Sequence, residues 1–412
     1  NRIGVFGMMA IMKIMEKLQL SIDEIDALTG PLAGRPKSAT FRTADVVGID
    51  TLIKVAKGVY DNCPNDEAKD IFNIPAWLNK MVENNWLGDK TGQGFFKKVK
   101  TPDGKSDIQV LNLKTMEYTA RQKPKFATLE AAKPIEDLPA RLKILINGTD
   151  KAGEFYRQFH YSLFSYISHR IPEISDEVYR LDDAMMAGFG WEIGAFESWD
   201  ASGVAKTTEA MKAAGFTVAK WVDDMLAAGH NTFYKVENGK RLYYDIAGKT
   251  YKNLPGGDTF LVMKYFTNQT IWKNSSSRVY HLGDDVLGLE WNTKMNSIGG
   301  EVLESIQKGI SLAEEKYKGL VIANESANFS AGANIGMIFM LAIEQDYDEI
   351  DMAIRMFQNT MMRVRYSSIP VVIAPHGLAL GGGCEICLHA DKVIPAAETY
   401  TGLVEVGIGV IP

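Results

Sequence analysis

A set of landmarks occurs twice, in the same order, within the first 255 residues of this chain. Each set contains an Asp-x-x-Gly turn, a Trp and a Met at helical spacing, two adjacent aromatic residues and a hairpin signal. An ordered recurrence of this kind indicates a duplicated structural unit, and it predicts two related helical units, residues 1–125 and 126–255. The first set is Asp45 with Gly48, Trp77 with Met81, Phe95 with Phe96, and Asp103 with Gly104; the second is Asp200 with Gly203, Trp221 with Met225, Phe233 with Tyr234, and Asn238 with Gly239.

Local signals inside these units are helical. Residues 1–20 are rich in methionine and place apolar side chains along one face of a helix, which indicates core packing. Ser21 and Glu24 form a capping box, the pattern that opens a new helix. Gly30 and Pro31 then interrupt the helical pattern. The expected architecture of this part of the chain is a pair of all-α units.

The hydrophobic period changes further along the chain. Residues 256–277 are polar and rich in turn-forming residues, so they are predicted to link the helical units to a new domain, residues 278–412. In that domain, stretches typical of strands alternate with stretches typical of helices, which argues for an α/β fold. The predicted strands are residues 281–291, 320–323 and 370–374, and the predicted helices are residues 298–317 and 348–364.

The composition fits a multidomain globular protein and excludes several other classes. The 412 residues are 46% hydrophobic and 23% charged, and this length suggests two or three domains. A formal net charge of −6 argues against a nucleic-acid-binding surface. No apolar run reaches the roughly 18 residues that a membrane-spanning helix needs. Cys63, Cys384 and Cys387 provide neither a disulfide framework nor a metal site, so a reducing compartment is expected.

The strongest site signal is a predicted strand that runs into three consecutive glycines, residues 381–383, and then into a helical segment. Glycines at such a turn let a ligand approach the backbone, and free N–H groups at a helix start favour developing negative charge. The same turn can also serve packing alone. Glu385, two residues after the last glycine, favours a functional interpretation, because it places a carboxylate where an acid or base would act.

Two further features accompany this turn. A second turn of small residues, 329–335, follows the predicted strand 320–323. Two such turns can direct two backbone N–H groups at one oxygen atom, which is the arrangement of an oxyanion hole. Glu405 is the only carboxylate in the last twelve residues. By itself it reads as a solvent-exposed loop charge, but beside the two turns it is a candidate second carboxylate.

Residues 278–412 resemble the enoyl-CoA hydratase/isomerase (crotonase) superfamily. The resemblance rests on Phe-Ser-Ala-Gly-Ala-Asn-Ile at residues 329–335, on Gly-Leu-Ala-Leu-Gly-Gly-Gly-Cys-Glu at 377–385, and on the segment 405–412. It implies an α/β domain of the crotonase type, a ββα spiral, that acts on acyl-CoA thioesters. The implied roles are a catalytic pair at Glu385 and Glu405, oxyanion-hole N–H groups at Ala333 and Gly382, and substrate or CoA contacts at Ala331, Gly332 and Gly381. Asn334 stands where the pattern usually has Asp, which changes local hydrogen bonding.

Residues 1–255 resemble the C-terminal helical domains of the 3-hydroxyacyl-CoA dehydrogenase family, and the second copy is more divergent. The resemblance rests on Asn-Arg-Ile-Gly at residues 1–4, on Asp-Val-Val-Gly-Ile-Asp at 45–50, and on the segment 87–96. It implies that Asn1 matches the family's active-site asparagine. A dehydrogenase part followed by a hydratase part resembles fused bifunctional enzymes of fatty-acid β-oxidation. The expected fold is therefore multidomain: duplicated all-α units followed by a truncated crotonase-type domain.

The resemblance also implies NAD as the dehydrogenase cofactor and coenzyme A as part of the substrate. The family's nucleotide-binding fingerprint and catalytic His–Glu pair are expected in a domain before residue 1, since both ends of the chain look cut. Without that domain, the chain is expected to lack dehydrogenase activity. The six histidines lie outside the family motif and read as surface or structural side chains: His160, His169, His230, His281, His376 and His389.

Other implications concern partners and location. The resemblance implies an acyl-CoA thioester as ligand, a homo-oligomer, a thiolase partner, no nucleic acid and no metal, and a cytoplasmic location in a bacterium or archaeon. Two alternatives stay open. An enoyl-CoA isomerase needs only one carboxylate, and the pair at Glu385 and Glu405 argues against it. A non-catalytic helical scaffold is the other alternative, and it would apply chiefly to residues 1–255.

Overall fold

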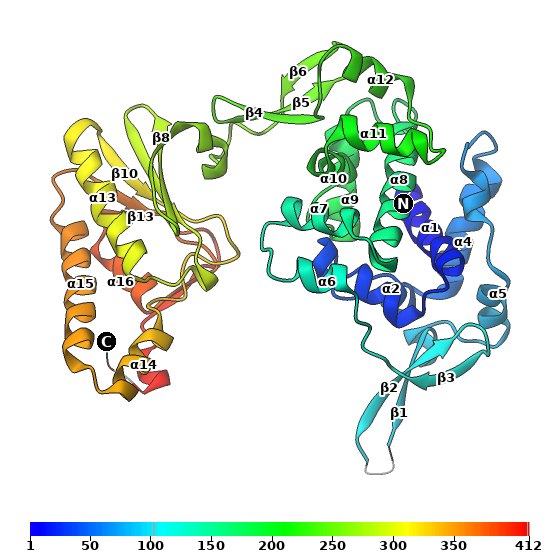
Figure 1. Cartoon of the computed structure of the whole chain (residues 1–412), viewed down its shortest axis with the longest axis horizontal. Helices are drawn as coiled ribbons and strands as arrows, with labels where there is room; N and C mark the ends of the chain where they lie inside the picture. The colour runs from blue at the N-terminus through cyan, green and yellow to red at the C-terminus, as the bar shows by residue number, and fades with distance from the viewer. Residues whose placement is uncertain (102–103, 410, 412) are drawn as a thin grey trace. The chain divides into compact units, whose positions relative to one another are not determined.

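The structure is a computed structural model that describes residues 1–101, 104–409 and 411. The chain divides into two compact units, each of which is described by itself (Figure 1). Unit 1 comprises Asn1–Lys235 with Leu242–Lys252, and unit 2 comprises Val236–Arg241 with Asn253–Pro412. The finer boundaries at residues 125, 255 and 277 stay predictions.

Residues 1–125 form a series of helices followed by a small antiparallel sheet of order β1-β2-β3. The elements are α1 (Arg2–Leu18), α2 (Ile22–Leu28), η1 (Pro31–Ala33), α3 (Phe41–Val47), α4 (Ile49–Asn62), η2 (Lys69–Phe72), α5 (Ala76–Glu83), η3 (Asp89–Thr91), β1 (Phe96–Lys100), β2 (Ser106–Asn112) and β3 (Glu117–Ala120).

Residues 126–255 repeat this order after two additional helices, and they too finish in three strands, β4-β5-β6. The elements are α6 (Ala127–Ala132), α7 (Leu138–Asn147), α8 (Lys151–Ser168), α9 (Val178–Phe189), α10 (Ala195–Ser202), α11 (Val204–Ala213), α12 (Lys220–Ala227), β4 (Tyr234–Glu237), β5 (Lys240–Asp245) and β6 (Thr250–Asn253). Because each series ends in strands, the expectation of all-α units is too narrow. Residues 1–255 are mainly helical and also contain two small sheets.

One aspartate near the start of each series makes the same backbone contacts. Asp26 accepts hydrogen bonds from the N–H groups of Phe41 and Arg42 at 2.7 and 3.2 Å. Asp182 accepts them from the N–H groups of Phe196 and Glu197 at 2.9 and 3.0 Å. Each carboxylate thereby satisfies the otherwise free N–H groups at the start of the next helix, α3 or α10.

A second aspartate in each series ties a helix to the first strand. Asp45 accepts from the N–H groups of Phe95 and Phe96 at 2.8 and 2.9 Å. Asp200 accepts from those of Phe233 and Tyr234 at 2.7 and 2.8 Å. Thus the aspartate and aromatic landmarks of the sequence are the two sides of one contact in each series.

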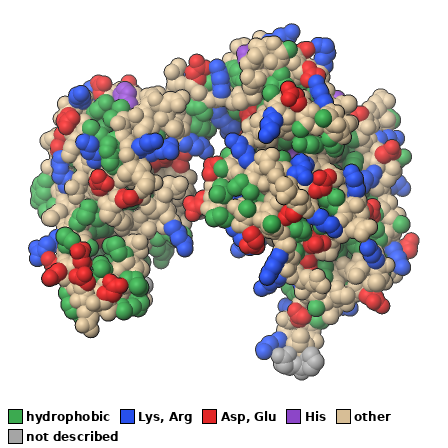
Figure 2. Space-filling model, viewed as in Figure 1, with side chains coloured by type: hydrophobic (Ala, Val, Ile, Leu, Met, Phe, Trp, Pro, Cys, Tyr) green, Lys and Arg blue, Asp and Glu red, His purple; other side chains and the backbone are tan. Residues whose placement is uncertain are grey.

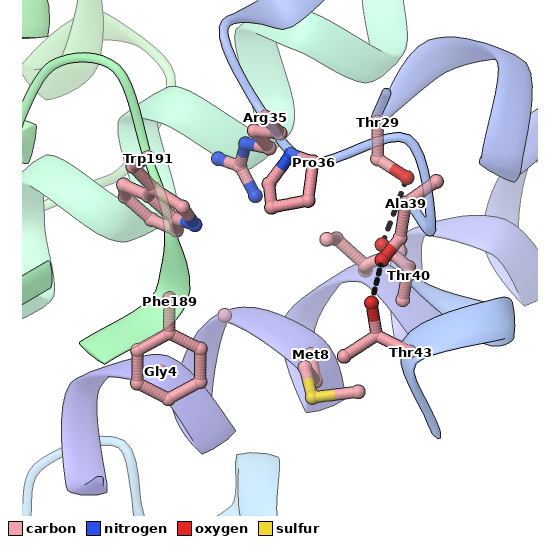
Figure 3. Close-up of a pocket in the computed structure, with 12 residues that line it drawn as sticks. Gly4, Met8, Thr29, Arg35, Pro36, Ala39, Thr40, Thr43, Phe189 and Trp191 are labelled. Carbon is pink, nitrogen blue, oxygen red and sulfur yellow. Dashed lines mark hydrogen bonds between the residues drawn. The ribbon is translucent and has the colours of Figure 1, made fainter. Parts of the chain in front are cut away.

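Helix α1 packs against α8 in the core of unit 1. The Phe6 ring stacks on that of Tyr166, with centroids 3.7 Å apart. Gly4 lies beneath the Phe189 ring (Figure 3), and a methyl group added at Gly4 would lie 1.9 Å from the ring atom Cζ. A glycine is therefore needed for α1 to approach the end of α9 this closely.

Several local expectations are confirmed in this unit. The helix predicted over residues 1–20 is α1, and Ser21 with Glu24 forms the capping box that opens α2. At the hairpin between β4 and β5, Asn238 and Gly239 both have positive φ, as a tight two-residue turn requires. In the other predicted hairpin, Asp103 lies outside the described residues.

Unit 2 is built around a mixed six-stranded sheet of order β13-β11-β10-β9-β8-β7. Strands β7, β8 and β9 are antiparallel, whereas β9, β10, β11 and β13 are parallel, and α13 packs on β8, β9, β10 and α15. The elements are η4 (Met263–Gln269), β7 (Thr270–Lys273), β8 (Ser277–Gly283), β9 (Val286–Trp291), η5 (Lys294–Asn296), α13 (Gly300–Lys316), β10 (Gly319–Ile322), α14 (Ile335–Glu344), α15 (Tyr347–Arg365), β11 (Val371–Ile373), β12 (Leu378–Leu380), α16 (Gly382–His389), β13 (Lys392–Val393), β14 (Tyr400–Gly402) and η6 (Glu405–Ile408).

The structure corrects two expectations in this unit. Residues 281–291 are not one strand, because Asp284 and Asp285 have φ of +51° and +60° and form the turn between β8 and β9. Residues 256–277 are not a plain linker, because they contain η4 and β7, and β7 pairs with β8 in the main sheet. Hydrophobic periodicity does not reveal a turn inside a run of alternating residues. It does not reveal a strand inside a polar run either.

Helix α14 follows the second turn of small residues, where the sequence predicts the start of a helix but not its extent, and the character of the helix explains why. None of its side chains is buried, although most are apolar: Phe339 is 64% and Ile343 60% exposed. Figure 2 shows hydrophobic side chains at the surface in the region that Figure 1 labels α14. An apolar helix without a polar face has no helical hydrophobic period to detect.

No helix in the described part of the chain combines the length and apolar character needed to cross a bilayer.

Candidate active site

The glycine-rich turn of unit 2 joins β12 to α16. Gly381 precedes the helix with φ of +50°, a conformation that favours glycine, and its N–H donates to Gly402 O at 2.9 Å. This bond belongs to a short parallel pairing of β12 with β14. The pairing places two segments next to each other: the start of α16, which carries Glu385, and the chain after β14, which carries Glu405.

The backbone N–H groups around the two turns divide into bonded and free ones. Those of Ala333 and Gly382 have no acceptor among the residues that the structure describes. Their neighbours are bonded: Ser330 to Leu378 O, Ala331 to Met295 O, Gly332 to Ser330 Oγ, Leu380 to Ser330 O, and Gly381 to Gly402 O. The two N–H groups predicted as oxyanion donors are thus left available for a ligand, as is that of Gly383, which like Gly382 lies in the first turn of α16.

The two turns also approach each other closely. A methyl group added at Gly382 would lie 3.3 Å from the Ala333 nitrogen, and one added at Gly332 would lie 3.1 Å from the Gly382 nitrogen. The first would also lie 2.6 Å from the Phe357 ring of α15. Glycine at both positions is therefore what allows the two nitrogens to lie on adjacent backbones.

Two carboxylates flank this turn. A methyl group added at Gly381 would lie 3.0 Å from Glu405 Oε1, and Glu405 Oε2 is buried with no hydrogen-bond partner among the described residues. Burial raises the pKa of Glu385, the negative charge of Glu405 raises it further, and His389 opposes this effect. Glu385 and Glu405 therefore interact electrostatically and are each half-buried.

The other predicted residues of this site lie in the same two turns. Ala331 is half-buried, and Gly332 and Gly381 are buried. Asn334 is the N-cap of α14, where its side chain accepts from the Met337 N–H at 3.4 Å. Asparagine and aspartate are both good N-cap residues, so the departure from the usual Asp keeps the cap.

Sequence patterns did not identify two residues that shape this site. The buried Ser330 accepts a hydrogen bond from Gly332 N–H at 3.1 Å and donates one to Asn296 O at 2.7 Å, which fixes the second turn. Phe357 covers Gly382 from α15. Neither role is marked by spacing, because Phe357 reaches the turn from another helix and the contact of Ser330 with Asn296 joins segments 34 residues apart.

Asn1 lies in unit 1, apart from this constellation. It is exposed at the N-terminus of α1, and its side chain makes no capping hydrogen bond. Further along the same helix, Gly4, Gly7 and Met8 line a small pocket of about 50 Å³.

That pocket holds one cation (Figure 3). The Arg35 guanidinium lies 4.0 Å from the centre of the Trp191 ring and 4.6 Å from that of Phe159, and burial lowers its pKa to about 10. On the other side, Thr40 donates to Thr29 Oγ1 at 2.8 Å. Arg35 stays protonated at neutral pH, stabilised by cation–π contacts.

No group of three or more potential metal ligands occurs among the described residues. Cys384 and Cys387 are free thiols in α16, both buried, and burial raises the pKa of Cys387 to about 12. A thiol with so high a pKa is a poor nucleophile and a poor metal ligand at neutral pH. The chemistry of the site therefore rests on its carboxylates and backbone N–H groups.

Comparisons with known proteins match both parts of the chain. Residues 1–98 match the family described as 3-hydroxyacyl-CoA dehydrogenase, C-terminal domain, and residues 286–412 match the enoyl-CoA hydratase/isomerase family. A probable 3-hydroxyacyl-CoA dehydrogenase of Bacillus subtilis is 43% identical over 414 residues, which cover 100% of this chain and 52% of that protein. A putative fatty acid oxidation complex trifunctional enzyme of Rickettsia prowazekii is 26% identical and is covered to 53%.

Among solved structures, an enoyl-CoA hydratase from Bacillus anthracis is 27% identical, with a TM-score of 0.31, over 34% of this chain and 54% of that chain. The chain spans about half the length of the curated relatives it matches. Residues 1–98 are thus similar to a 3-hydroxyacyl-CoA dehydrogenase C-terminal domain, and residues 286–412 are similar to an enoyl-CoA hydratase/isomerase domain.

Proposed function

We propose that the site of unit 2 adds water to a trans-2-enoyl-CoA and yields a 3-hydroxyacyl-CoA. The observation that carries the proposal is the pair of free N–H groups at Ala333 and Gly382, on adjacent backbones and beside two half-buried carboxylates. Hydration of an enoyl thioester needs a sink for enolate charge, an acceptor for a proton of water and a donor for the α-carbon. These four groups provide all three.

In the proposed reaction, the oxygen of water bonds to the β-carbon while the π electrons move toward the thioester oxygen. The N–H groups of Ala333 and Gly382 stabilise the negative charge on that oxygen. One of the two carboxyl groups accepts a proton from the water, and the other gives a proton to the α-carbon. The two must therefore hold different protonation states, and the mutual repulsion of Glu385 and Glu405 favours such a split.

The test replaces each carboxylate in the full-length protein. Glu385→Gln and Glu405→Gln should each lower kcat for hydration by several orders of magnitude, with little change in KM, because the lost interaction forms in the transition state. The matched control is Glu398→Gln, an exposed glutamate between the two, which should leave both constants unchanged. Hydration that survives the double substitution would exclude the proposal.

A second candidate is isomerisation of a trans-3-enoyl-CoA, which needs one carboxylate to move a proton. The same assay separates the two reactions, because only hydration incorporates oxygen from ¹⁸O-labelled water into the product. If Glu405→Gln removes hydration but leaves isomerisation intact, the site is bifunctional rather than a pure hydratase.

We also propose that the whole protein oxidises the resulting 3-hydroxyacyl-CoA with NAD, in fatty-acid β-oxidation. The match of residues 1–98 and the names of the relatives support this role. The sequence contains no GxGxxG fingerprint, so its residues do not fit a dinucleotide and no hydride step is assigned to them. Asn1 is the proposed dehydrogenase residue. A homo-oligomer, a thiolase partner and a cytoplasmic location complete the proposal.

Finally, we propose that residues 1–125 and 126–255 are copies of one unit. The shared order of helices and the matching aspartate contacts support it. In the second copy Asp150 stands where Asn1 stands in the first, and it caps α8 by accepting from Gly153 N–H at 3.0 Å. The second copy, residues 126–255, would then be a non-catalytic scaffold. The scaffold alternative would apply to that segment and not to residues 1–125. A superposition of α1–α5 on α8–α12 that fails would exclude duplication.

A further inference from the structure

Unit 1 contains a cavity of about 740 Å³ that the reactions above do not use. It lies between α2, the outer face of the β1-β2-β3 sheet, and the chain from Arg121 to Lys133. Small-molecule sites typically have volumes of about 300–1,000 Å³, so the cavity is large enough to enclose most of a nucleotide-sized ligand.

One wall of this cavity is apolar. Phe96 and Lys98 lie on the same face of β1, because side chains alternate along a strand, and Ile108 is the direct partner of Lys98 on β2. Ile108 is 45% exposed, which is unusual for a large apolar side chain in a sheet that has a covered face. Ile108 thus offers an apolar surface on which a ring or an aliphatic chain can pack, above the buried Phe96.

The remaining lining is charged, with seven Lys or Arg side chains and four Asp or Glu side chains. The acidic groups are already engaged. Asp23 pairs with Arg121, Asp89 with Arg42 and Glu130 with Lys133, at 2.8, 2.5 and 2.5 Å. Asp26 accepts two backbone hydrogen bonds, and burial raises its pKa to about 7, so it carries less than a full negative charge at neutral pH.

Four lysines of the cavity have no counterion. Lys37, Lys98, Lys123 and Lys125 lie beyond ion-pair distance of any carboxylate in the described residues, in a chain whose formal net charge is −6. Uncompensated cations around a concave surface focus the electrostatic potential and attract anions.

Arg121 is a further cation of the cavity that can bind an anion, and its side chain is held in place. Its Nε donates to Asp23, which is 3% exposed, and its guanidinium stacks over the Phe96 ring at 4.9 Å. Its two terminal nitrogens make no hydrogen bond with a described residue. The hydrogen bond at Nε and the contact with the ring fix the orientation of the guanidinium. Its two terminal nitrogens are therefore oriented in advance to donate hydrogen bonds to phosphate oxygens.

We propose that this cavity binds a multiply phosphorylated small molecule, with its phosphates on Arg121 and the four lysines and its apolar part against Ile108. The shared chemistry is a diphosphate joined to a ring or chain. It has two sources: a free nucleotide, or the nucleotide part of a CoA thioester. The proposal does not depend on the hydratase, whose residues all lie in unit 2.

The second series of unit 1 shows that the fold itself does not require these cations. Arg42 donates its backbone N–H to Asp26, and the residue that does so to Asp182 is Glu197, of opposite charge. Counting from the aromatic pairs bonded to Asp45 and Asp200, Lys98 corresponds to Val236. At these two positions the cation is therefore specific to the first series.

The test is a calorimetric titration of the 412-residue chain with inorganic pyrophosphate and with ADP, at low and high salt. Both should bind, more weakly at high salt, and adenosine should not. The triple variant Lys98→Gln/Lys123→Gln/Lys125→Gln should weaken ADP binding by about tenfold or more. All three lysines are exposed, so its melting temperature should equal that of the parent.

The control variant is Lys57→Gln/Lys80→Gln/Lys151→Gln, which removes the same charge from exposed positions of unit 1 outside the cavity. It should bind ADP as the parent does. Equal weakening by both triples would overturn the proposal, as would failure of pyrophosphate and ADP to bind, or adenosine binding as tight as ADP.

A competition experiment then separates the two sources. If CoA displaces bound ADP at a lower concentration than unlabelled ADP does, the cavity is assigned to the CoA thioester. If CoA needs a higher concentration, the cavity is assigned to a free nucleotide. Either result supports a phosphate site. Protection of Lys98, Lys123 and Lys125 from acetylation by bound ADP provides an independent readout.

Discussion

The Glu405 carboxylate is half-buried, and its Oε2 atom has no hydrogen-bond partner in the described part of the chain. A buried acceptor without a partner costs about 1–3 kcal/mol, so folding stability does not account for it. In the proposed hydratase, this free oxygen and the neighbouring Glu385 are the groups that would hold the reacting water. The cost is then the expected signature of a group kept available for chemistry.

The coupling of these two carboxylates can be measured directly. Glu405→Gln should lower the pKa of Glu385 toward its ordinary value, because the substitution removes a negative charge that disfavours ionisation. The measurement is a pH titration of the Glu385 carboxyl carbon by NMR. Glu398→Gln serves as control and should leave the titration unchanged. A Glu385 pKa that does not respond to Glu405→Gln would show that the two groups lie too far apart to share one water.

A second residue-scale prediction concerns Asp182, whose pKa burial raises to about 8. An unfolded aspartate ionises near pH 3.9, so between about pH 4 and 8 the folded state holds a proton that the unfolded state has lost. The stability contributed by the protonated form is complete below pH 4 and is lost as the pH rises through 8. The free energy of unfolding should therefore fall with rising pH, by at most about 1.4 kcal/mol per pH unit for this one carboxyl.

Urea denaturation of the chain at several pH values between 5 and 8 tests this expectation. Asp182→Asn cannot titrate, so its pH dependence should be flatter than that of the parent over this range, although its absolute stability is lower. Parallel curves for the two proteins would contradict the raised pKa.

Single residues of the site were predictable where the chemistry demands one residue type. The glycines of the 381–383 turn and Glu385 were recognisable, because few structural reasons place a carboxylate two residues after a glycine run. Phe357 could not be predicted, since it covers Gly382 from α15, a segment distant in sequence. Ser330 lies within the second turn, but its role depends on the hydrogen bond that it donates to Asn296 O, 34 residues earlier in the chain.

At the scale of elements, the contact between α1 and α9 sets a sharp requirement. Gly4→Ala places a methyl group 1.9 Å from the Phe189 ring, and the resulting overpacking should destabilise the protein by about 1–3 kcal/mol. Gly7→Ala, one turn later in the same helix, meets only the Phe159 ring at 3.9 Å, an ordinary contact. It should instead stabilise the helix by up to about 1 kcal/mol.

Chemical denaturation of the two variants side by side measures the difference. If Gly4→Ala is as stable as Gly7→Ala, the Phe189 ring does not hold α1 in the position described.

Helices with a single buried face were predictable from the sequence, as α13 and α15 show. The strands were less so. β12, β13 and β14 have only two or three residues each, too few for a hydrophobic period to develop. The turn at Asp284 and Asp285 fell inside a run with strand-like alternation. The positions of these short strands and of the turn are determined by pairing with strands distant in the sequence. A local sequence pattern holds no information about that pairing.

At the scale of the whole molecule, residues 1–412 carry a candidate hydratase site but no dinucleotide fingerprint. The chain as purified should therefore form no NADH from a 3-hydroxyacyl-CoA and NAD. The readout is absorbance of NADH, with purified dehydrogenase added at the end as a positive control for substrate and cofactor. Turnover before that addition would show that the 412 residues bind NAD by a route that their sequence does not reveal.

The parallel pairing of β12 with β14 has a consequence for how such proteins can vary in length. Glu385 comes five residues after the end of β12, and Glu405 comes three residues after the end of β14. Because three residue pairs fix the register of these strands, they also set the distance between the two carboxylates. One inserted or deleted residue at 403–404 would displace Glu405 while leaving the sheet intact. The loop at 394–399, which precedes β14, can change length without moving either carboxylate. Natural insertions and engineered tags should therefore be tolerated in that loop and excluded at residues 403–404, directly after β14.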